Sequence, residues 1–354
     1  MSDSADRRTT LLALDAAELA ARFVELGLKP FHARIARGAV LEKGVTDYAA
    51  MTSLPAAARE RLARELPILS GREVERRVSA DRTTKLLLEF PGAGGRAATV
   101  ETVFIPPRDP TSGKGATLCV STQVGCPVAC PFCASGRAGL VRNLEAHEIV
   151  EQYVRGRALG ELSRSVVMGI GEPLLNFDAV RRALDVVHDE MNLGQRKVTL
   201  STVGFPERLR RIAPEKPRFQ LAISLHTPDQ EQRDRLVPAM RGVPIEEVLA
   251  AADDWFEKTG REVTYEYVLL AGENDSLGHA ERLAQRLAGR RCTVNLIPFN
   301  PVDDSGFGRP SASAVERFQR ILESRGIVST VRWSRGVESD AACGQLRIRA
   351  ASPA

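Results

Sequence analysis

Four of the six cysteines in this chain lie within the fifteen residues from Cys119 to Cys133. Three of them, Cys126, Cys130 and Cys133, are spaced C-x3-C-x2-C. Zinc sites usually take four protein ligands from two separated pairs, and here no histidine is nearby to complete a tetrahedron. Three soft thiolates at this spacing favour an iron-sulfur cluster. The alternatives are a disulfide pair or thiols buried in a core.

A 4Fe-4S cluster held by three cysteines leaves one iron without a protein ligand, and that iron could bind a cofactor. Further along the chain, glycine and polar residues follow predicted strands. They are Gly171 and Glu172, then Ser201, then the three consecutive residues Ser224, Leu225 and His226, and finally Asn300. Because chemistry sits at the carboxyl ends of parallel strands, we expect these residues to share one rim and to hold a nucleoside cofactor there. Taken singly, each is as well explained as a cap or turn residue.

The elements that must position this rim begin near Thr117. Short apolar runs alternate with amphipathic segments, and they lie at residues 117–121, 165–169, 197–202, 218–224, 263–270 and 292–298. Repeated strand-helix units predict a parallel sheet, and six of them suffice for a partial or full barrel. The predicted fold class is therefore α/β, with a partial (β/α)6-type barrel.

The residues before the barrel have a different pattern. Apolar residues recur at helical spacing between residues 9 and 70, where Asp15 is the expected cap of a helix, and two strand-like runs at 83–90 and 98–105 predict a hairpin. The expected organisation is a small helical accessory domain over 1–75, a β-hairpin and linker over 76–115, and the barrel over 116–350. The accessory domain is either an RNA-docking unit or a solvated helical cap.

Composition sets broad limits on function. The 354 residues carry a net charge of +4 with a pI near 8.8, a mildly basic balance that permits a nucleic-acid partner. No apolar run is long enough to span a bilayer, and the amino terminus does not have the pattern of a signal peptide. We therefore expect a cytoplasmic protein without a membrane partner. In that compartment clustered cysteines indicate metal binding or catalysis more often than structural disulfides.

The cysteine loop resembles the signature of the radical S-adenosylmethionine (SAM) superfamily. Several further motifs, in the same order, resemble the RlmN/Cfr family of radical RNA methyltransferases. They lie at residues 101–103, 117–121, 142–144, 171–176, 200–202, 224–226, 295–300 and 341–346. The resemblance covers residues 80 to 350. It implies a radical SAM barrel, one 4Fe-4S cluster on Cys126, Cys130 and Cys133, and SAM as the cofactor of the open iron.

Residues 171–176, Gly-Glu-Pro-Leu-Leu-Asn, are similar to the RlmN branch of that family. This branch methylates carbon 2 of an adenine in 23S ribosomal RNA (rRNA) and often in transfer RNA (tRNA), whereas the Cfr branch methylates carbon 8. Carbon 2 is electron-poor and has no lone pair, so a polar attack on the sulfonium methyl group fails and a radical route is needed. The expected partners are 23S rRNA, with tRNA as a second candidate, and a flavodoxin- or ferredoxin-type electron donor.

The resemblance also assigns roles to three residues outside the cluster loop. Cys343 takes a methyl group from one SAM, and a second SAM, cleaved at the cluster, yields the radical that removes hydrogen from that methyl group. Glu101 matches the base and Cys119 the resolving thiol, which would leave a transient disulfide with Cys343. Cys292 matches no role and is expected in the core. The alternatives are a Cfr-like carbon 8 methyltransferase and a non-enzymatic iron-sulfur RNA-binding protein.

Overall fold

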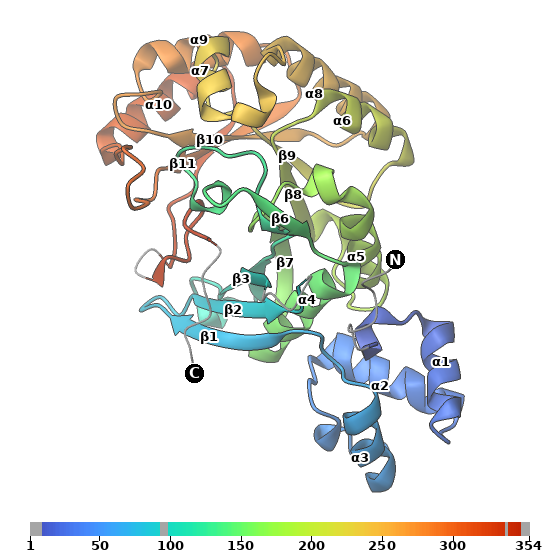
Figure 1. Ribbon diagram of the computed structural model, residues 1–354. Helices are drawn as coiled ribbons and strands as arrows, with labels where there is room; N and C mark the ends of the chain where they lie inside the picture. The colour runs from blue at the N-terminus through green and yellow to red at the C-terminus, as the bar shows by residue number, and fades with distance from the viewer. Residues whose placement is uncertain (1–8, 93–97, 337–338, 348–354) are drawn as a thin grey trace.

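A ten-stranded sheet forms the frame of the molecule in the computed structural model, which describes residues 9–92, 98–336 and 339–347. The strand order is β1-β2-β3-β4-β7-β8-β9-β10-β11-β12 (Figure 1). Within this sheet, the strands from β4 onward pair in parallel, whereas β1 to β4 pair antiparallel. Since β12 does not pair with β1, the barrel is open, as predicted. The expected connection of the hairpin at 93–95 and the barrel residues 348–350 lie outside the described residues.

The six predicted strand runs are all present as parallel strands. They are β4 (Ala116–Cys119), β7 (Leu162–Val167), β8 (Val198–Thr202), β9 (Gln220–Ser224), β10 (Val263–Leu269) and β11 (Cys292–Pro298). A seventh parallel strand, β12 (Ser329–Val331), was not predicted, because three residues are too few to show a strand pattern. The helices that follow the strands are α4 (Ala146–Leu159), α5 (Phe177–Asp189), α6 (Pro206–Ile212), α7 (Gln230–Leu236), α8 (Ile245–Thr259), α9 (Leu277–Leu287) and α10 (Ala312–Ser324).

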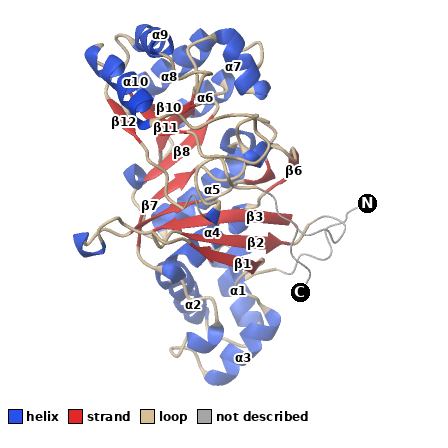
Figure 2. Ribbon diagram, turned by 90° about the vertical axis from the view of Figure 1, so that its left-hand side faces the viewer, coloured by secondary structure: helices blue, strands red, loops and turns tan. Residues whose placement is uncertain are grey.

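The predicted hairpin is present as β2 (Thr84–Phe90) and β3 (Ala98–Ile105), and β1 (Arg72–Val78) extends it by one edge strand (Figure 2). The sequence of β1, Arg-Glu-Val-Glu-Arg-Arg-Val, gave no strand signal because it is mostly charged. Charged side chains are a common protection of an exposed sheet edge against pairing with another chain. A separate two-stranded sheet, β5 (Gln123–Gly125) with β6 (Leu140–Asn143), flanks the cysteine loop.

The amino-terminal helices α1 (Ala16–Glu25), α2 (Pro30–Lys43) and α3 (Ala56–Glu65) form a small layer beside α4 and α5. Asp15 caps α1 as expected, since its carboxylate accepts hydrogen bonds from the backbone N–H groups of Ala17 and Glu18. Arg37 of α2 donates to Glu190 at the end of α5, with 2.7 Å between Nη2 and Oε1. Across the described residues, none of the helices combines the length and the apolar character that crossing a bilayer requires.

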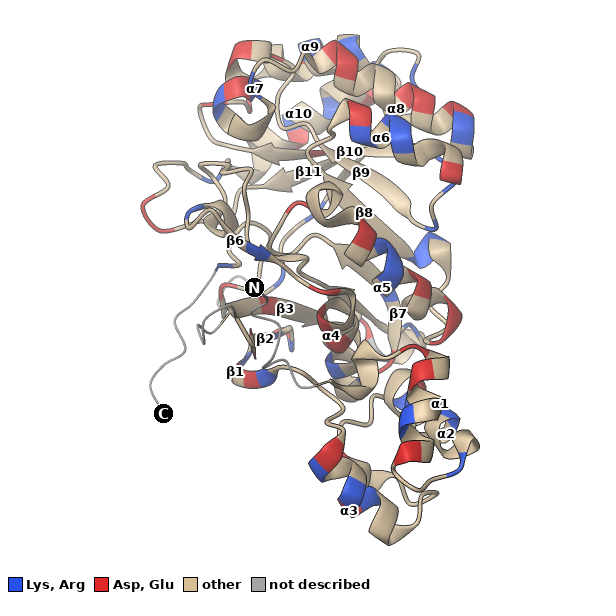
Figure 3. Ribbon diagram, turned by 45° about the vertical axis from the view of Figure 1, so that its right-hand side comes forward, with Lys and Arg blue, Asp and Glu red and all other residues tan. Residues whose placement is uncertain are grey.

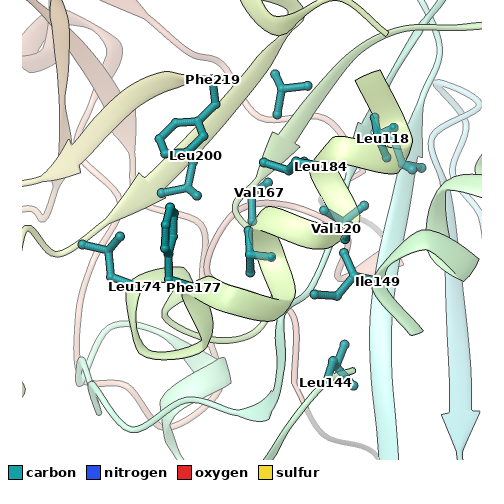
Figure 4. Packing of buried hydrophobic residues seen from close by; sticks show 14 of the residues in the cluster. Leu118, Val120, Leu144, Ile149, Val167, Leu174, Phe177, Leu184, Leu200 and Phe219 are labelled. Carbon is teal, nitrogen blue, oxygen red and sulfur yellow. The ribbon is translucent and has the colours of Figure 1, made fainter. Parts of the chain in front are cut away.

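The two faces of the parallel sheet have different side chains because side chains alternate along a strand. On the helix-covered face, Leu118, Val167 and Leu200 pack against Phe177 and Leu184 of α5 (Figure 4). The opposite face carries the alternate residues of the same strands, among them Cys119, Val166 and Ser201. The apolar contacts of the first face therefore decide which side chains reach the second.

This alternation predicts unequal costs for two neighbouring substitutions in β8. Leu200 is fully buried, so Leu200→Ala should lower the free energy of unfolding by about 2 to 5 kcal/mol. Ser201→Ala removes only a hydroxyl on the other face and should cost about 1 kcal/mol or less. Urea denaturation followed by circular dichroism measures both. Equal losses at the two positions would contradict the assignment of the faces.

Candidate active site

Ten of the predicted site residues line one cavity at the carboxyl ends of the parallel strands. They are Cys126, Cys130, Cys133, Gly171, Glu172, Ser201, Ser224, His226, Asn300 and Cys343. We call this space the first cavity. Leu225 is fully buried in the core and is not among the lining residues, although its backbone N–H donates to the carbonyl of Glu266 over 3.0 Å. Glu101 and Cys119 also lie outside the lining of this cavity.

The three cysteines of the loop are held by backbone hydrogen bonds. The N–H of Cys126 donates to the Gly139 carbonyl and that of Cys133 to the Cys130 carbonyl, each over 3.0 Å. Burial raises the pKa of the Cys126 thiol to about 12 and raises the pKa values of Cys130 and Cys133. The free thiols are therefore protonated at neutral pH, and a bound metal would displace these protons.

The three cysteine thiols can be compared with the ligands that a metal ion or an iron-sulfur cluster requires. Among the described residues, no three His, Cys, Asp or Glu side chains are grouped so as to hold a single metal ion. In an iron-sulfur cluster, however, each thiolate binds a different iron, so the thiolates need not converge on one centre. Three half-buried thiols lining the first cavity fit such a cluster.

Glu172 is oriented by the loop that follows β7. Gly171 has a φ of 111°, and a Cβ atom at this position would lie 2.7 Å from the side chain of Gln123, so only glycine fits. The Glu172 carboxylate accepts hydrogen bonds from the Thr202 hydroxyl at 2.6 Å and from the N–H groups of Val203 at 2.9 Å and Leu174 at 3.0 Å. Burial raises the pKa of Glu172, while these bonds lower it. The carboxylate is thus rigidly placed on the cavity wall.

The other rim residues come from the next strands. Ser201 and Ser224 end neighbouring strands, with their hydroxyl oxygens 3.3 Å apart. Burial and the nearby Arg233 guanidinium lower the pKa of His226 to about 3, so its imidazole is neutral. Its Nδ1 accepts from the Val268 N–H at 3.2 Å, which leaves Nε2 as a donor. A neutral donor and two hydroxyls can orient a polar ligand without adding charge.

Cys343 lines a second cavity as well as the first. The second cavity is lined by Cys119, Met168, Arg332 and Cys343, among others, so Cys343 stands in a wall that both spaces share. Burial, then the neighbouring Cys343, raise the pKa of the Cys119 thiol to about 12, and Arg332 opposes the shift. The pKa of the Arg332 guanidinium is raised, chiefly by Cys343. Cys119 therefore stays a protonated thiol at rest.

Sequence reasoning missed two charged residues of the site, Arg332 and Glu266. Glu266 lies in β10 and pairs in register with Ser224, and its carboxylate accepts from the Asn295 amide at 2.7 Å. An acidic residue inside an otherwise apolar strand was a usable signal, since a buried carboxylate needs partners. Arg332 follows the three-residue strand β12, where no sequence pattern pointed to it.

The segment that carries Cys343 is bound to the cluster loop and to the end of β11. The Asn300 amide donates to the Cys343 carbonyl at 3.0 Å, the Ala134 N–H to the Gly344 carbonyl at 2.8 Å, and the Ser135 hydroxyl to the Leu346 carbonyl at 2.6 Å. Asn300, expected to bind cofactor, lines the first cavity and also positions Cys343. Three hydrogen bonds from these two segments thus fix the backbone around this cysteine.

Both ends of the same segment are held by a buried ion pair on β2 and β3. The Lys85 ammonium lies 3.0 Å from the Glu101 carboxylate, and the exposed fractions of the two side chains are 3% and 0%. Lys85 also donates to the Asp340 carbonyl at 2.9 Å, while the other Glu101 oxygen accepts from the Arg347 N–H at 2.8 Å. The pair therefore acts as a clamp on residues 340–347.

This clamp predicts a large cost for removing one charge. Lys85→Met leaves the buried Glu101 carboxylate uncompensated and should lower the free energy of unfolding by about 3 to 5 kcal/mol, measured by urea denaturation. The double variant Lys85→Met/Glu101→Leu should be less destabilised than that single variant. Arg72→Met, which breaks the exposed pair with Glu89, should cost under about 1 kcal/mol and serves as the control. A loss at Lys85 no larger than at Arg72 would rule out the clamp.

The comparisons with known proteins cover nearly the whole chain. Residues 120–284 match the radical SAM superfamily and residues 9–68 match the ribosomal RNA large subunit methyltransferase N-terminal domain. A probable dual-specificity RNA methyltransferase RlmN from Parasynechococcus marenigrum is 44% identical over 349 residues, covering 96% of this chain and 98% of that protein. A relative of the same name from Gloeobacter violaceus is 42% identical, with 97% of each chain covered.

A solved structure gives the same result. The crystal structure of a radical SAM methyltransferase from Sphaerobacter thermophilus matches this fold with a TM-score of 0.86 at 42% identity, and the match covers 96% of this chain and 99% of that one. The predicted family and the predicted radical SAM fold are thereby confirmed. The chain belongs to the RlmN family of radical SAM RNA methyltransferases.

Proposed function

We propose that this RNA methyltransferase methylates carbon 2 of an adenine in 23S rRNA, with tRNA as a second substrate, and that Cys343 carries the methyl carbon. The observation that supports this most directly is the place of Cys343 between two cavities. One side of it faces the three cluster cysteines and the rim, and the other faces Cys119. A carrier thiol needs access to a methyl donor on one side and to an acceptor on the other.

The family implies a 4Fe-4S cluster and SAM, for which the first cavity offers the ligands. Cys126, Cys130 and Cys133 would hold the cluster. When bound, these groups supply the methyl group, the radical that takes one hydrogen atom from it, and the acceptor of the electron that the RNA adduct loses. Two SAM molecules per methylation follow from this scheme.

The rim residues of the chain would orient SAM. A carboxylate offers about four acceptor positions, and three hydrogen bonds to Glu172 come from the protein, so one position is left for the ammonium of SAM. Ser201, Ser224 and the neutral His226 would receive its hydroxyl and carboxylate groups. These contacts fix the reacting atoms next to the Cys343 sulfur.

The steps at the cysteines balance as follows. The Cys343 thiolate forms a bond to the methyl carbon as the carbon–sulfonium bond of SAM breaks. After losing a hydrogen atom, that carbon bonds to carbon 2 of adenine, the adduct gives up one electron, and Glu101 accepts the proton from carbon 2. The Cys119 thiolate then attacks the Cys343 sulfur, so a disulfide forms, the Cys343 sulfur–carbon bond breaks, and its electron pair and a proton complete the new methyl group.

The position of Glu101 adds a condition to this scheme. Its carboxylate is bound by Lys85 and by the Arg347 N–H, and residues of the same segment line the second cavity. For Glu101 to reach the adenine, residues 340–347 would have to shift when RNA binds. Likewise Cys119, whose pKa is about 12, must lose its proton before it attacks, and Arg332 beside it favours the thiolate.

A flavodoxin- or ferredoxin-type donor and a cytoplasmic location belong to the same proposal. The cluster must be reduced before each radical forms, and three cluster thiolates together with two reactive cysteines require a reducing compartment. The non-enzymatic alternative is not retained, because the relatives are RNA methyltransferases over nearly their full length.

The two-cysteine scheme predicts different products for two variants. Cys343→Ala has no sulfur to deliver carbon and should give neither methylated RNA nor an adduct. Cys119→Ala should still bond its methylene carbon to adenine and then stall, which leaves RNA covalently attached through Cys343. Denaturing gels run with and without ribonuclease detect the adduct. A folded, cluster-loaded Cys119→Ala protein that carries no RNA would overturn the assignment of Cys119 as the resolving thiol.

The position of methylation is tested by the product. The RlmN-like residues Pro173–Asn176 form a short 3-10 helix, and the Asn176 amide donates to the carbonyls of Thr122 and Leu144. These residues shape the rim. Whether carbon 2 or carbon 8 of adenine is methylated has to be measured. We expect 2-methyladenosine as the main product of digested RNA, separated from the 8-methyl isomer by chromatography and mass spectrometry. A predominance of 8-methyladenosine would assign the chain to the Cfr branch.

A further inference from the structure

The second cavity is unusually rich in positive charge. Its described lining contains five basic residues and no acidic one, although the chain as a whole has nearly balanced charges, with 49 basic and 45 acidic residues. The basic residues are Arg164, Arg196, Lys197, Arg332 and Arg335. On outer helices such as α6 and α8, acidic and basic residues are interspersed (Figure 3). The cavity therefore differs in charge from these outer helices.

The five cations have different surroundings. Arg335 pairs with Asp81 at 2.9 Å and donates to its carbonyl at 2.6 Å, so it is used by the fold. Arg332 is half-buried beside the two cysteines. Arg164, Arg196 and Lys197 are exposed, and no carboxylate of the described residues pairs with any of them. Unpaired like charges that gather in a hollow favour an anionic ligand.

The strand register places these three cations near the cysteines. Ser165 pairs with Val198, so the preceding residues are neighbours, Arg164 on β7 and Lys197 directly before β8. Arg164 lies two residues before Val166, which pairs with Cys119, and two residues of strand span about 7 Å. Phosphates bound at these cations would thus lie about one nucleotide away from the cysteines.

A tryptophan completes this wall. Trp333 lines the second cavity and has 40% of its side chain exposed, and the Arg309 guanidinium lies 6.0 Å from its ring. Aromatic side chains beside basic ones are the usual means of holding unpaired nucleotides, because bases stack on the ring while cations bind the backbone. The first cavity, with the cluster cysteines, has no such combination among its described lining residues.

We propose that the second cavity is the entrance for the RNA strand. Arg164, Arg196 and Lys197 bind phosphates next to the target adenine, Trp333 stacks on a base, and the adenine reaches Cys343 from the side of Cys119 while the cofactor approaches from the first cavity. The inference rests on the proposed function and adds to it the direction from which the substrate enters. An acidic protein such as an electron donor is the competing ligand for a basic surface. It is disfavoured because the cluster cysteines line the other cavity.

The test compares two triple variants in cluster-loaded, full-length protein. The first is Arg164→Ala/Arg196→Ala/Lys197→Ala. The control, Lys258→Ala/Arg317→Ala/Arg320→Ala, removes the same charges from exposed positions on α8 and α10 that likewise have no carboxylate partner among the described residues. Thermal melting and iron content establish that both variants are folded and loaded.

Binding of an unmodified 23S rRNA transcript is measured across a salt series. Each single-strand phosphate contact contributes about 0.7 to the slope of log affinity against log salt, so the first variant should lose about 2 from that slope. The control should bind as the wild type does. The first variant should also show a raised KM for RNA with a smaller change in kcat. Unchanged affinity and slope in the first variant would overturn the proposal.

Trp333 gives a readout that does not depend on catalysis. The chain has two tryptophans, and Trp255 is fully buried, so a change in emission on adding RNA reports on Trp333. RNA should quench this emission in the wild type, and Trp333→Phe should abolish the quenching. Emission that RNA leaves unchanged would rule out stacking at this wall.

Two further outcomes distinguish the RNA entrance from an electron-donor site and from the proposed function. If the first variant binds RNA normally and loses turnover only with a protein electron donor, and not with dithionite, the cations serve the donor and the proposal is wrong. If the wild type makes no methylated adenine, the proposed function fails, whereas RNA affinity and quenching still decide whether the cavity admits RNA. If the first variant methylates RNA and binds it as well as the control variant does, the proposed RNA entrance is wrong, whereas the proposed function stands.

Discussion

The alternation of side chains along in-register strands is the constraint on which the site depends. Cys119 pairs with Val166, Ser201 with Ala222, and Ser224 with Glu266, so one face of the sheet collects the cysteine, the rim hydroxyls and the buried carboxylate. A slip of one residue would turn each of these side chains toward the helices. The register is secured from the other face, where residues such as Leu118 and Leu200 are enclosed by apolar contacts. Core packing and chemistry are therefore two results of the same pairing.

An open barrel leaves the concave face of its sheet uncovered, and here the carboxyl-terminal segment contacts that face. In Figure 1 the red chain descends from the side of β11 toward β2 and β3. Its hydrogen bonds join Cys343 to Asn300 of the barrel, and its two ends to Lys85 and Glu101 of the antiparallel strands. Burying an ion pair is costly, and an apolar pair would often be as stable. The pair instead holds the segment with the proposed carrier thiol next to the proposed base, so Glu101 is released only when that segment shifts.

The sequence predicted the parts of the molecule that have a local pattern. Six parallel strands were recognisable as apolar runs, and the rule that polar residues at strand ends share a rim brought Ser201, Ser224 and Glu172 together correctly. The rule failed for Leu225, whose side chain points into the core because its neighbours Ser224 and His226 face the cavity. The strand β1 was missed because an edge strand need not be apolar. The second cavity could not be predicted, since its lining comes from several separate segments between residues 105 and 346 and exists only through tertiary contacts.

Position also explains how several thiols in one site can have different reactions. Cys119 lines the second cavity and not the first, packs in a small apolar cluster with Val103 and Leu346, and has a pKa near 12. Cys119 does not compete with the three loop cysteines for iron, because it is absent from the lining of their cavity. Cys343 reaches both spaces because it stands in their common wall. In the proposed scheme, the order of reaction is thus set by which cavity each sulfur can reach.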